Sequence, residues 1–126
     1  VQPDILHVGG ITECHKVAIM ADANMIHVAP HNPNGLVGTL ASQHIMASCY
    51  YASVLETHRD LREPQQWQLD LHYGERMIFK DGYAPLPSKP GLGIDLDEKV
   101  AIAHRRKAQG VQGTPRTFKD GSIPNP

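Results

Sequence analysis

Apolar residues at helical spacing predict two helices in the first half of the chain. Between residues 11 and 23, apolar side chains return every three or four positions and so fall on one face of a helix. Thr12 is the expected N-cap of this helix and Asn24 its expected end. A second helix is expected over residues 36–49, where His44 lies on the apolar stripe and should be a core histidine with satisfied hydrogen bonds.

Three short apolar runs predict buried strands that alternate with these helices. The runs cover residues 1–6, 25–29 and 51–55. Each ends near a polar residue, namely Asp4, His31 or Glu56, and these are separated by 27 and 25 residues. One strand–helix crossover takes roughly 30 residues, so the spacing predicts parallel strands that end on the same rim. The three polar side chains are therefore expected to share a site.

The chain becomes more polar and irregular after Glu56. Residues 57–75 contain Pro64 and predict an irregular stretch or one short helix. A strand is expected over residues 76–79, and it should end at a turn formed by residues 81–82, an Asp-Gly pair.

The last part of the sequence predicts a linker, a helix and a tail. Residues 85–93 are rich in proline and glycine and favour a rigid, extended linker. Asp95, with Glu98 three positions later, has the pattern of a capping box and predicts a last helix over residues 95–108. Residues 109–126 predict a tail that follows the surface or frays.

Composition and charge exclude several classes of partner. The 126 residues carry a formal net charge of −1, so no positive field attracts nucleic acid or an anionic membrane. Aromatic residues are only 6% of the chain, which disfavours stacking on single-stranded nucleic acid. No apolar run approaches the roughly 20 residues of a membrane span. Cys14 and Cys49 could form a disulfide, but such sparse usage favours reduced thiols and a cytoplasmic location.

His31 is the first candidate for chemistry, because the turn around it contains Pro30 and Pro33 and is therefore stiff. An imidazole takes and returns protons near neutral pH. A strand-end histidine bonded to the backbone is the alternative. Asp4 would orient the imidazole or would merely cap a turn. Glu56 would complete the site or would be an exposed residue where a strand becomes a loop.

The local sequences around these residues resemble the last part of an enolase-superfamily barrel. They are QPDILHVGGITE around Asp4, VAPHNP around His31 and SVLE around Glu56. The resemblance is to the mandelate racemase branch, and within it to acid-sugar dehydratases of the galactonate-dehydratase type. It implies an α/β fold, namely strands 6–8 and the following helices of a TIM-like (β/α)-barrel. Residues 1–80 would form these units, and residues 81–126 would return toward a capping domain.

The same resemblance implies a reaction on a small sugar-acid substrate. Enzymes of this family use Mg²⁺ to bind the substrate carboxylate while the neighbouring proton is removed. In a dehydratase, water then leaves to give a 2-keto-3-deoxy acid. His31, oriented by Asp4, would be the catalytic base or acid, and Glu56 would be a buried hydrogen-bond donor to the enolate. The resemblance also implies substrate contacts from His7, Pro33 and His58.

The resemblance assigns the metal-binding carboxylates to strands upstream of Val1, so we expect no metal ligand in this chain. Val1 is not a methionine, and three parallel strands alone would leave two open edges. We therefore expect the chain to be part of a larger homo-oligomeric enzyme and to be inactive by itself. A racemase, epimerase or cycloisomerase of the same superfamily and a non-catalytic binding module that stands alone are the alternatives.

Overall fold

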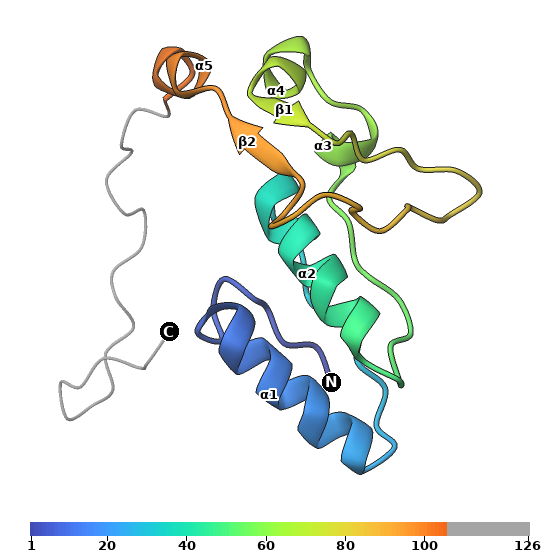
Figure 1. Cartoon of the computed structure of the whole chain (residues 1–126). Helices are drawn as coiled ribbons and strands as arrows, with labels where there is room; N and C mark the ends of the chain where they lie inside the picture. Colours follow the sequence, from blue (N-terminus) through green and yellow to red (C-terminus); the bar gives the residue numbers. More distant parts are fainter. Residues whose placement is uncertain (106–126) are drawn as a thin grey trace, which may run out of the picture.

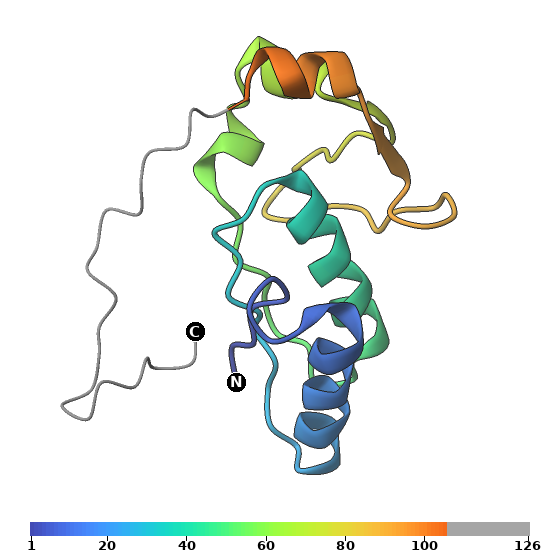
Figure 2. The ribbon, with the colours of Figure 1, turned by 90° about the vertical axis from the view of Figure 1, so that its left-hand side faces the viewer.

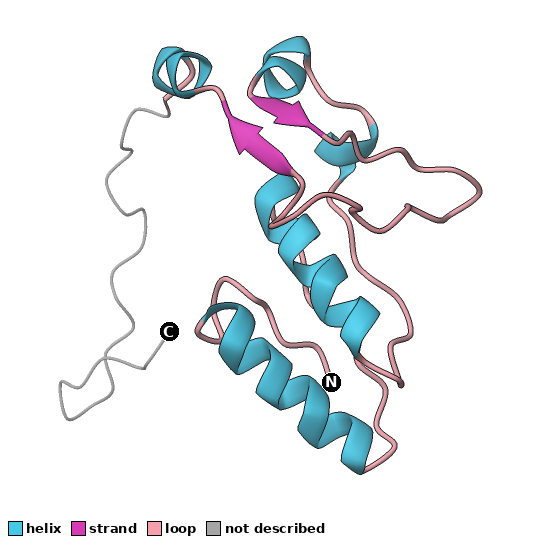
Figure 3. Cartoon of the chain, viewed as in Figure 1, coloured by secondary structure: helices cyan, strands magenta, loops and turns pink. Residues whose placement is uncertain are grey.

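The computed structural model describes residues 1–105, so the predicted tail over residues 109–126 lies outside the described residues. The last helix, predicted to reach residue 108, ends earlier, at Ala103. The first two helices are long, and every later element has six residues or fewer. Figure 1 labels these elements, and Figure 3 separates helices from strands. In chain order they are α1 (Gly10–Ala23), α2 (Leu36–Ser48), α3 (Arg59–Arg62), α4 (Gln66–Asp70), β1 (His72–Gly74), β2 (Ile94–Leu96) and α5 (Glu98–Ala103).

Helix α1 begins at a pair of glycines. Gly9 is the N-cap with φ 106°, and Gly10 follows with φ 85°. These backbone angles favour glycine, because a side chain would be strained there. The prediction of Thr12 as N-cap is wrong, since the glycine pair lets the helix begin earlier. Asn24 ends the helix as predicted, and its backbone N–H donates to the carbonyl of Ala21 at 3.0 Å.

Helix α2 packs beside α1, and the two helices share one small core (Figures 1 and 2). The helix lies between Gly35 and Cys49, close to the predicted range of 36–49. His44 differs from the prediction, because its Nε2 atom is buried without a hydrogen-bond partner among the described residues. The core side chains are Ile5, Cys14, Ala18, Ala21, Val28, Ala41, Ile45 and Cys49.

The three predicted strands lie side by side as parallel segments but do not form regular strands. The Val1 amino group donates to the carbonyl of His27 at 2.7 Å, and the Val1 carbonyl accepts from the Ala29 N–H at 3.0 Å. On the other side, Val28 forms a parallel bridge with Ala52. Each contact spans only a residue or two, and parallel strands are stable when neighbours cover them on both sides. The order of the segments is as predicted, whereas their predicted length as strands is wrong.

Two short helices, α3 and α4, replace the single short helix or irregular stretch predicted over residues 57–75. The predicted strand over residues 76–79 is wrong, because the strand in this region is β1, which pairs antiparallel with β2. Gly74 of β1 faces Ile94, and a Cβ at Gly74 would lie 2.5 Å from the carbonyl oxygen of Gly93. The close approach of the two segments therefore requires glycine.

The predicted turn at Asp81 and Gly82 is present. Lys80 and Tyr83 exchange backbone hydrogen bonds of 2.8 and 2.9 Å, and the two residues between them have φ values of 52° and 81°. These angles are typical of the tight turns that join hairpin strands. Beyond the turn, the segment predicted as a linker contacts α2, because a side-chain amide of that helix donates to the Pro85 carbonyl at 3.3 Å.

Helix α5 begins later than the helix predicted over residues 95–108. The Asp97 side chain accepts hydrogen bonds of 2.9 and 3.1 Å from the backbone N–H groups two and three positions further on. Such an N-cap satisfies donors that the helix itself leaves unpaired. The first helical residue is therefore Glu98. Asp95 lies in β2, so its predicted pairing with Glu98 in a capping box is wrong.

The predicted division between residues 1–80 and 81–126 stays a prediction. Strands β1 and β2 come from opposite sides of it and pair directly with each other.

Within residues 1–105, no helix is both long enough and apolar enough to cross a membrane.

Candidate active site

Asp4 and His31 form a direct side-chain contact at the ends of two neighbouring parallel segments. The Oδ2 atom of Asp4 lies 2.9 Å from Nδ1 of His31. The Asp4 side chain is held in place, because its Oδ1 accepts hydrogen bonds from the Leu6 N–H at 2.9 Å and from Asn34 Nδ2 at 3.2 Å. Asp4 is buried, whereas His31 is exposed. A fixed carboxylate thus holds one nitrogen of an accessible imidazole.

The surroundings of Asp4 keep its carboxylate ionised. Burial raises the pKa of the Asp4 carboxyl. Hydrogen bonds from the Leu6 N–H, His31 and Asn34 outweigh this effect, so the net pKa lies below its ordinary value. An ionised carboxylate only accepts hydrogen bonds, so the His31 nitrogen that faces it, Nδ1, carries the hydrogen. In the neutral ring, Nε2 then has a free lone pair that can take a proton.

Glu56 lies next to this pair and is linked to it by one residue. Its Oε2 atom accepts a hydrogen bond of 3.1 Å from the backbone N–H of Asn32, which directly follows His31. The Glu56 carbonyl accepts a second bond of 2.8 Å from Asn32 Nδ2. The structure therefore brings Asp4, His31 and Glu56 to the same end of the parallel segments. The expected burial of Glu56 is wrong for this chain, in which the residue is exposed.

The other three predicted site residues lie on the loops around this centre. The Nε2 atom of His7 is 3.9 Å from Asp4 Oδ2, and its side chain is 71% exposed. Pro33 is exposed within the turn that follows His31, and His58 is exposed two positions after Glu56. All three are accessible, and their contact with a substrate stays a prediction.

Sequence reasoning missed two asparagines of the same turn. Asn34 donates to Asp4, and Asn32 bonds to both the backbone and the side chain of Glu56. Asparagine is common in turns because its side chain bonds to nearby backbone, so the sequence HNPN indicates a turn and does not indicate partners far along the chain. Their partners lie 30 and 24 residues away along the chain.

The described residues do not fit a magnesium site. Among them, no group of three or more His, Cys, Asp or Glu side chains is arranged to hold a metal ion. Magnesium prefers an octahedral set of oxygen ligands. The oxygens of Asp4 already accept from Leu6, His31 and Asn34, so this carboxylate is committed to other partners.

Both cysteines are free thiols in the core, as the sequence predicted. Burial raises the pKa of Cys14. Burial and the hydrogen bond to Asp22 raise the pKa of Cys49 to about 11. Thiols with raised pKa values are poor nucleophiles. The Cys49 Sγ atom instead donates to Asp22 Oδ1 at 3.0 Å, which helps attach the end of α2 to α1.

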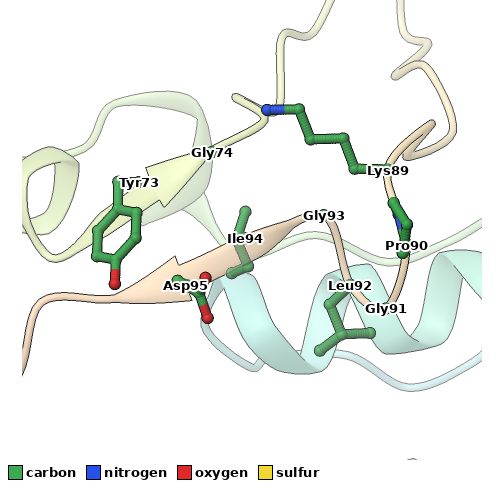
Figure 4. Close-up of a pocket in the computed structure, with 9 residues that line it drawn as sticks. All are labelled: Tyr73, Gly74, Lys89, Pro90, Gly91, Leu92, Gly93, Ile94 and Asp95. Atoms are coloured by element: carbon green, nitrogen blue, oxygen red, sulfur yellow. The ribbon is translucent and has the colours of Figure 1, made fainter.

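A cavity of about 480 Å³ lies away from the site, beside the β1–β2 pair. Residues 73–74 and 89–95 line it, and Figure 4 shows Lys89 on the loop facing the strands. Its lining includes none of Asp4, His31 and Glu56. An exposed loop forms much of the cavity wall, whereas the candidate catalytic residues lie at the ends of the parallel segments.

Comparison with known protein families agrees with this site, in which acids on neighbouring parallel segments flank an oriented histidine. Residues 1–100 match the family described as enolase C-terminal domain-like. The chain belongs to this family. Membership in the enolase C-terminal domain-like family confirms the predicted fold class, the C-terminal part of a TIM-like barrel, and explains why three parallel segments alternate with helices.

Relatives within the enolase superfamily sharpen this assignment. A D-galactonate dehydratase from Ralstonia nicotianae is 36% identical over 97% of this chain, which spans 32% of that protein. A mandelate racemase/muconate lactonizing enzyme from Jannaschia sp. CCS1 superposes with a TM-score of 0.73 and 32% identity, over 86% of this chain and 27% of that one.

An enolase from Pantoea ananatis, solved with bound D-gluconate and magnesium, gives a TM-score of 0.71 at 29% identity. It matches 81% of this chain and 24% of its own. The chain thus spans about a third or less of the length of the relatives it matches. The predicted likeness to the galactonate-dehydratase-like members of the superfamily is confirmed.

Proposed function

We propose that this chain supplies the acid–base residues of an acid-sugar dehydratase. The reaction removes the proton next to the carboxylate of a sugar acid and expels the adjacent hydroxyl, protonated by a general acid, as water. The enol that remains then takes its keto form, a 2-keto-3-deoxy acid. The observation that carries the proposal is the 2.9 Å contact between Asp4 and His31, with Glu56 beside it. The 36% identity to a D-galactonate dehydratase supports dehydration as the outcome.

In this proposal His31 moves the proton. Its Nε2 atom takes the proton from the substrate carbon, or returns one to the product carbon, according to the configuration of the substrate. Asp4 accepts from Nδ1, so it keeps the ring oriented and stabilises the positive charge that the ring gains. The exposure of the His31 side chain, 52%, leaves room for a substrate to approach.

Glu56, in its protonated form, would donate a hydrogen bond to the enolate that forms after the proton has left. The Asn32 N–H already fixes one of its oxygens at 3.1 Å, and a group that stabilises a transition state must be held before the reaction begins. His7, Pro33 and His58 are proposed to contact the rest of the sugar acid. These roles place all proposed contacts on one end of the parallel segments.

Magnesium belongs to this proposal only for the complete protein. The Pantoea ananatis enolase holds magnesium together with D-gluconate, whereas the residues described here do not fit such a site. We propose, from the family resemblance, that the metal ligands lie on barrel strands outside this chain. Assembly as a homo-oligomer and a cytoplasmic location are likewise proposed, and neither nucleic acid nor a membrane is proposed as a partner.

The test is to assay the protein, as its gene encodes it, against a panel of aldonates and aldarates. We expect a 2-keto-3-deoxy product to form from at least one sugar acid, with D-galactonate the first to try. Activity should require Mg²⁺ and disappear on chelation. Turnover that is insensitive to chelation, or a panel without any dehydrated product, would contradict the proposal.

Racemisation or epimerisation is the second candidate, because the Jannaschia neighbour is a mandelate racemase/muconate lactonizing enzyme. Both reactions begin with removal of the same proton, so the site geometry alone fits both. They separate when the panel is incubated in deuterium oxide. Exchange or inversion at C2 without loss of water would favour the racemase, and a dehydrated product favours the lyase.

A further inference from the structure

Asn32 links the proposed base to the proposed enolate-binding acid. It lies directly after His31 and is 0% exposed. Its backbone N–H donates to Glu56 Oε2 at 3.1 Å, and its Nδ2 donates at 2.8 Å to both the Glu56 carbonyl and Thr39 Oγ1. One residue thus attaches the end of the second parallel segment to the end of the third and to helix α2.

The chemistry of the partners fixes which way the Asn32 amide faces. The Glu56 carbonyl can only accept a hydrogen bond. The Thr39 hydroxyl gives its hydrogen to the Gly35 carbonyl at 3.1 Å, so toward Asn32 it accepts. Both contacts therefore require the NH₂ group of the amide, and aspartate at position 32 could not supply them.

The remaining amide oxygen indicates that this arrangement is not optimised for stability alone. The Oδ1 atom of Asn32 is buried and has no hydrogen-bond partner among the described residues. A buried acceptor without a partner opposes folding. The side chain retains this unfavourable atom while its two donated bonds determine where Glu56 lies relative to His31.

We propose that Asn32 is a positioning residue that sets the placement of the Glu56 carboxylate beside His31. It does not touch the substrate. Its side chain holds the Glu56 backbone, which lets its own N–H hold the Glu56 carboxylate. This inference rests on the proposed function, since it assumes that His31 and Glu56 act on one substrate.

The test measures kcat and KM of the complete protein on the sugar acid that it turns over, together with its Tm. The principal variant is Asn32→Asp, which keeps the shape but loses both donated bonds. Thr39→Val removes one acceptor and keeps the shape, and Thr39→Ser restores the hydroxyl. The matched control is Asn24→Asp, because Asn24 Nδ2 also donates to a backbone carbonyl, that of Met20 at 2.8 Å, but at the end of α1.

Misplacing a group that acts in the transition state lowers kcat more than it raises KM. For Asn32→Asp we expect kcat to fall about 10- to 100-fold, as for other residues that orient catalytic groups, with KM within about threefold. Thr39→Val should lower kcat less, and Thr39→Ser should recover it. Asn24→Asp should leave both constants unchanged.

A merely structural role predicts a different pattern. Asn32→Asp would then lower Tm while kcat per folded molecule stayed near that of the unaltered protein, and this result would overturn the inference. Equal kcat values for Thr39→Val and Thr39→Ser would overturn it as well. If the unaltered protein converted no sugar acid, the proposed function would fail and the inference would fall with it. If the unaltered protein turned over a sugar acid and Asn32→Asp had the same kcat, the inference would be wrong while the proposed function would stand.

Discussion

Residues 1–56 and residues 57–105 are stabilised in different ways. The buried apolar side chains that the structure describes all lie in the first region, where α1, α2 and the parallel segments enclose them. The second region has none of these buried apolar side chains, and exposed hydrogen bonds connect its segments. Examples are the Asp97 cap of α5 and the bonds that Ser88 donates to Glu75.

The candidate active site lies in the region with the core. Asp4 and Asn32 are buried among the elements that form it, and they hold His31 and Glu56 at its surface. Catalytic groups must be placed within fractions of an ångström, which requires supporting residues that cannot move freely. The first region can therefore supply precise geometry, whereas the second region contributes cover for α2 and a loop cavity.

The largest expected effect comes from replacing the proposed base. His31→Asn should lower kcat/KM of the complete protein by about 10²- to 10⁴-fold, the range typical for a lost general acid or base. The control is His72→Asn in the second region, because His72 Nδ1 also bonds to one partner, the Gln68 carbonyl at 3.2 Å. Product formation from the sugar acid measures both. Equal losses of kcat/KM in the two variants would contradict the assignment of the catalytic site to the first region.

The next effect is on stability. Ile45 of α2 is 2% exposed, and Ile102 of α5 is 73% exposed. Ile45→Ala should lower the free energy of unfolding by about 2–5 kcal/mol, because it removes buried surface and leaves a cavity. Ile102→Ala should change it by less than about 0.5 kcal/mol. Urea unfolding of the complete protein measures both values, and a large loss for Ile102→Ala would reveal a core that includes α5.

A smaller effect is expected within the second region. Gly74 and Gly91 both have positive φ, 118° and 66°, but only at Gly74 would a Cβ meet backbone, the Gly93 carbonyl at 2.5 Å. Both substitutions by alanine carry a backbone cost of about 1–2 kcal/mol. Gly74→Ala should in addition separate β1 from β2. Faster hydrogen exchange at the Glu75 N–H, which donates to Gly93, is the measurement; similar exchange in both variants would contradict the role assigned to Gly74.

The smallest effect concerns acid stability. The hydrogen bonds from the Cys49 thiol and from the Tyr51 and Tyr50 N–H groups lower the pKa of Asp22 below its ordinary value. A carboxyl whose pKa is lower in the folded state stabilises that state above its unfolded pKa, and the contribution disappears as pH falls through the folded pKa. Asp22→Asn should therefore make stability depend less on pH between about 5 and 3.

Glu75→Gln is the matched variant for this measurement. Hydrogen bonds from Ser88 lower the pKa of Glu75 as well, with the same sign. Asp22, however, joins α1 to the chain after α2, whereas Glu75 holds only the loop that leads to Ser88. The quantity to compare is the difference between the urea midpoints at pH 7 and pH 3. Relative to the unaltered protein, this difference should change more in Asp22→Asn than in Glu75→Gln. A larger change for Glu75→Gln would show that the loop in the second region contributes more to acid stability than the Asp22 contacts in the first region do, which would contradict the prediction.

The sequence predicted local structure best where neighbouring residues decide it. The end of α1 follows from helical spacing and from Asn24, which favours a helix end, and the range of α2, which ends one residue before the predicted Cys49, follows from helical spacing. The turn at Asp81 follows from its own backbone preference together with the next glycine. Prediction failed for β1, because its pairing with β2 depends on a contact between segments twenty residues apart in the chain.

For the candidate site, the sequence predicted that Asp4, His31 and Glu56 lie together. Their regular spacing indicated this, since parallel crossovers of similar length return strand ends to one rim, and the local sequences around them pointed to the same family. The folded arrangement was needed to see how these residues are held: which His31 nitrogen faces Asp4, and that Asn32 connects His31 to Glu56. The physical reason is that such bonds join residues 24 to 27 positions apart, and their geometry depends on how the intervening helices pack.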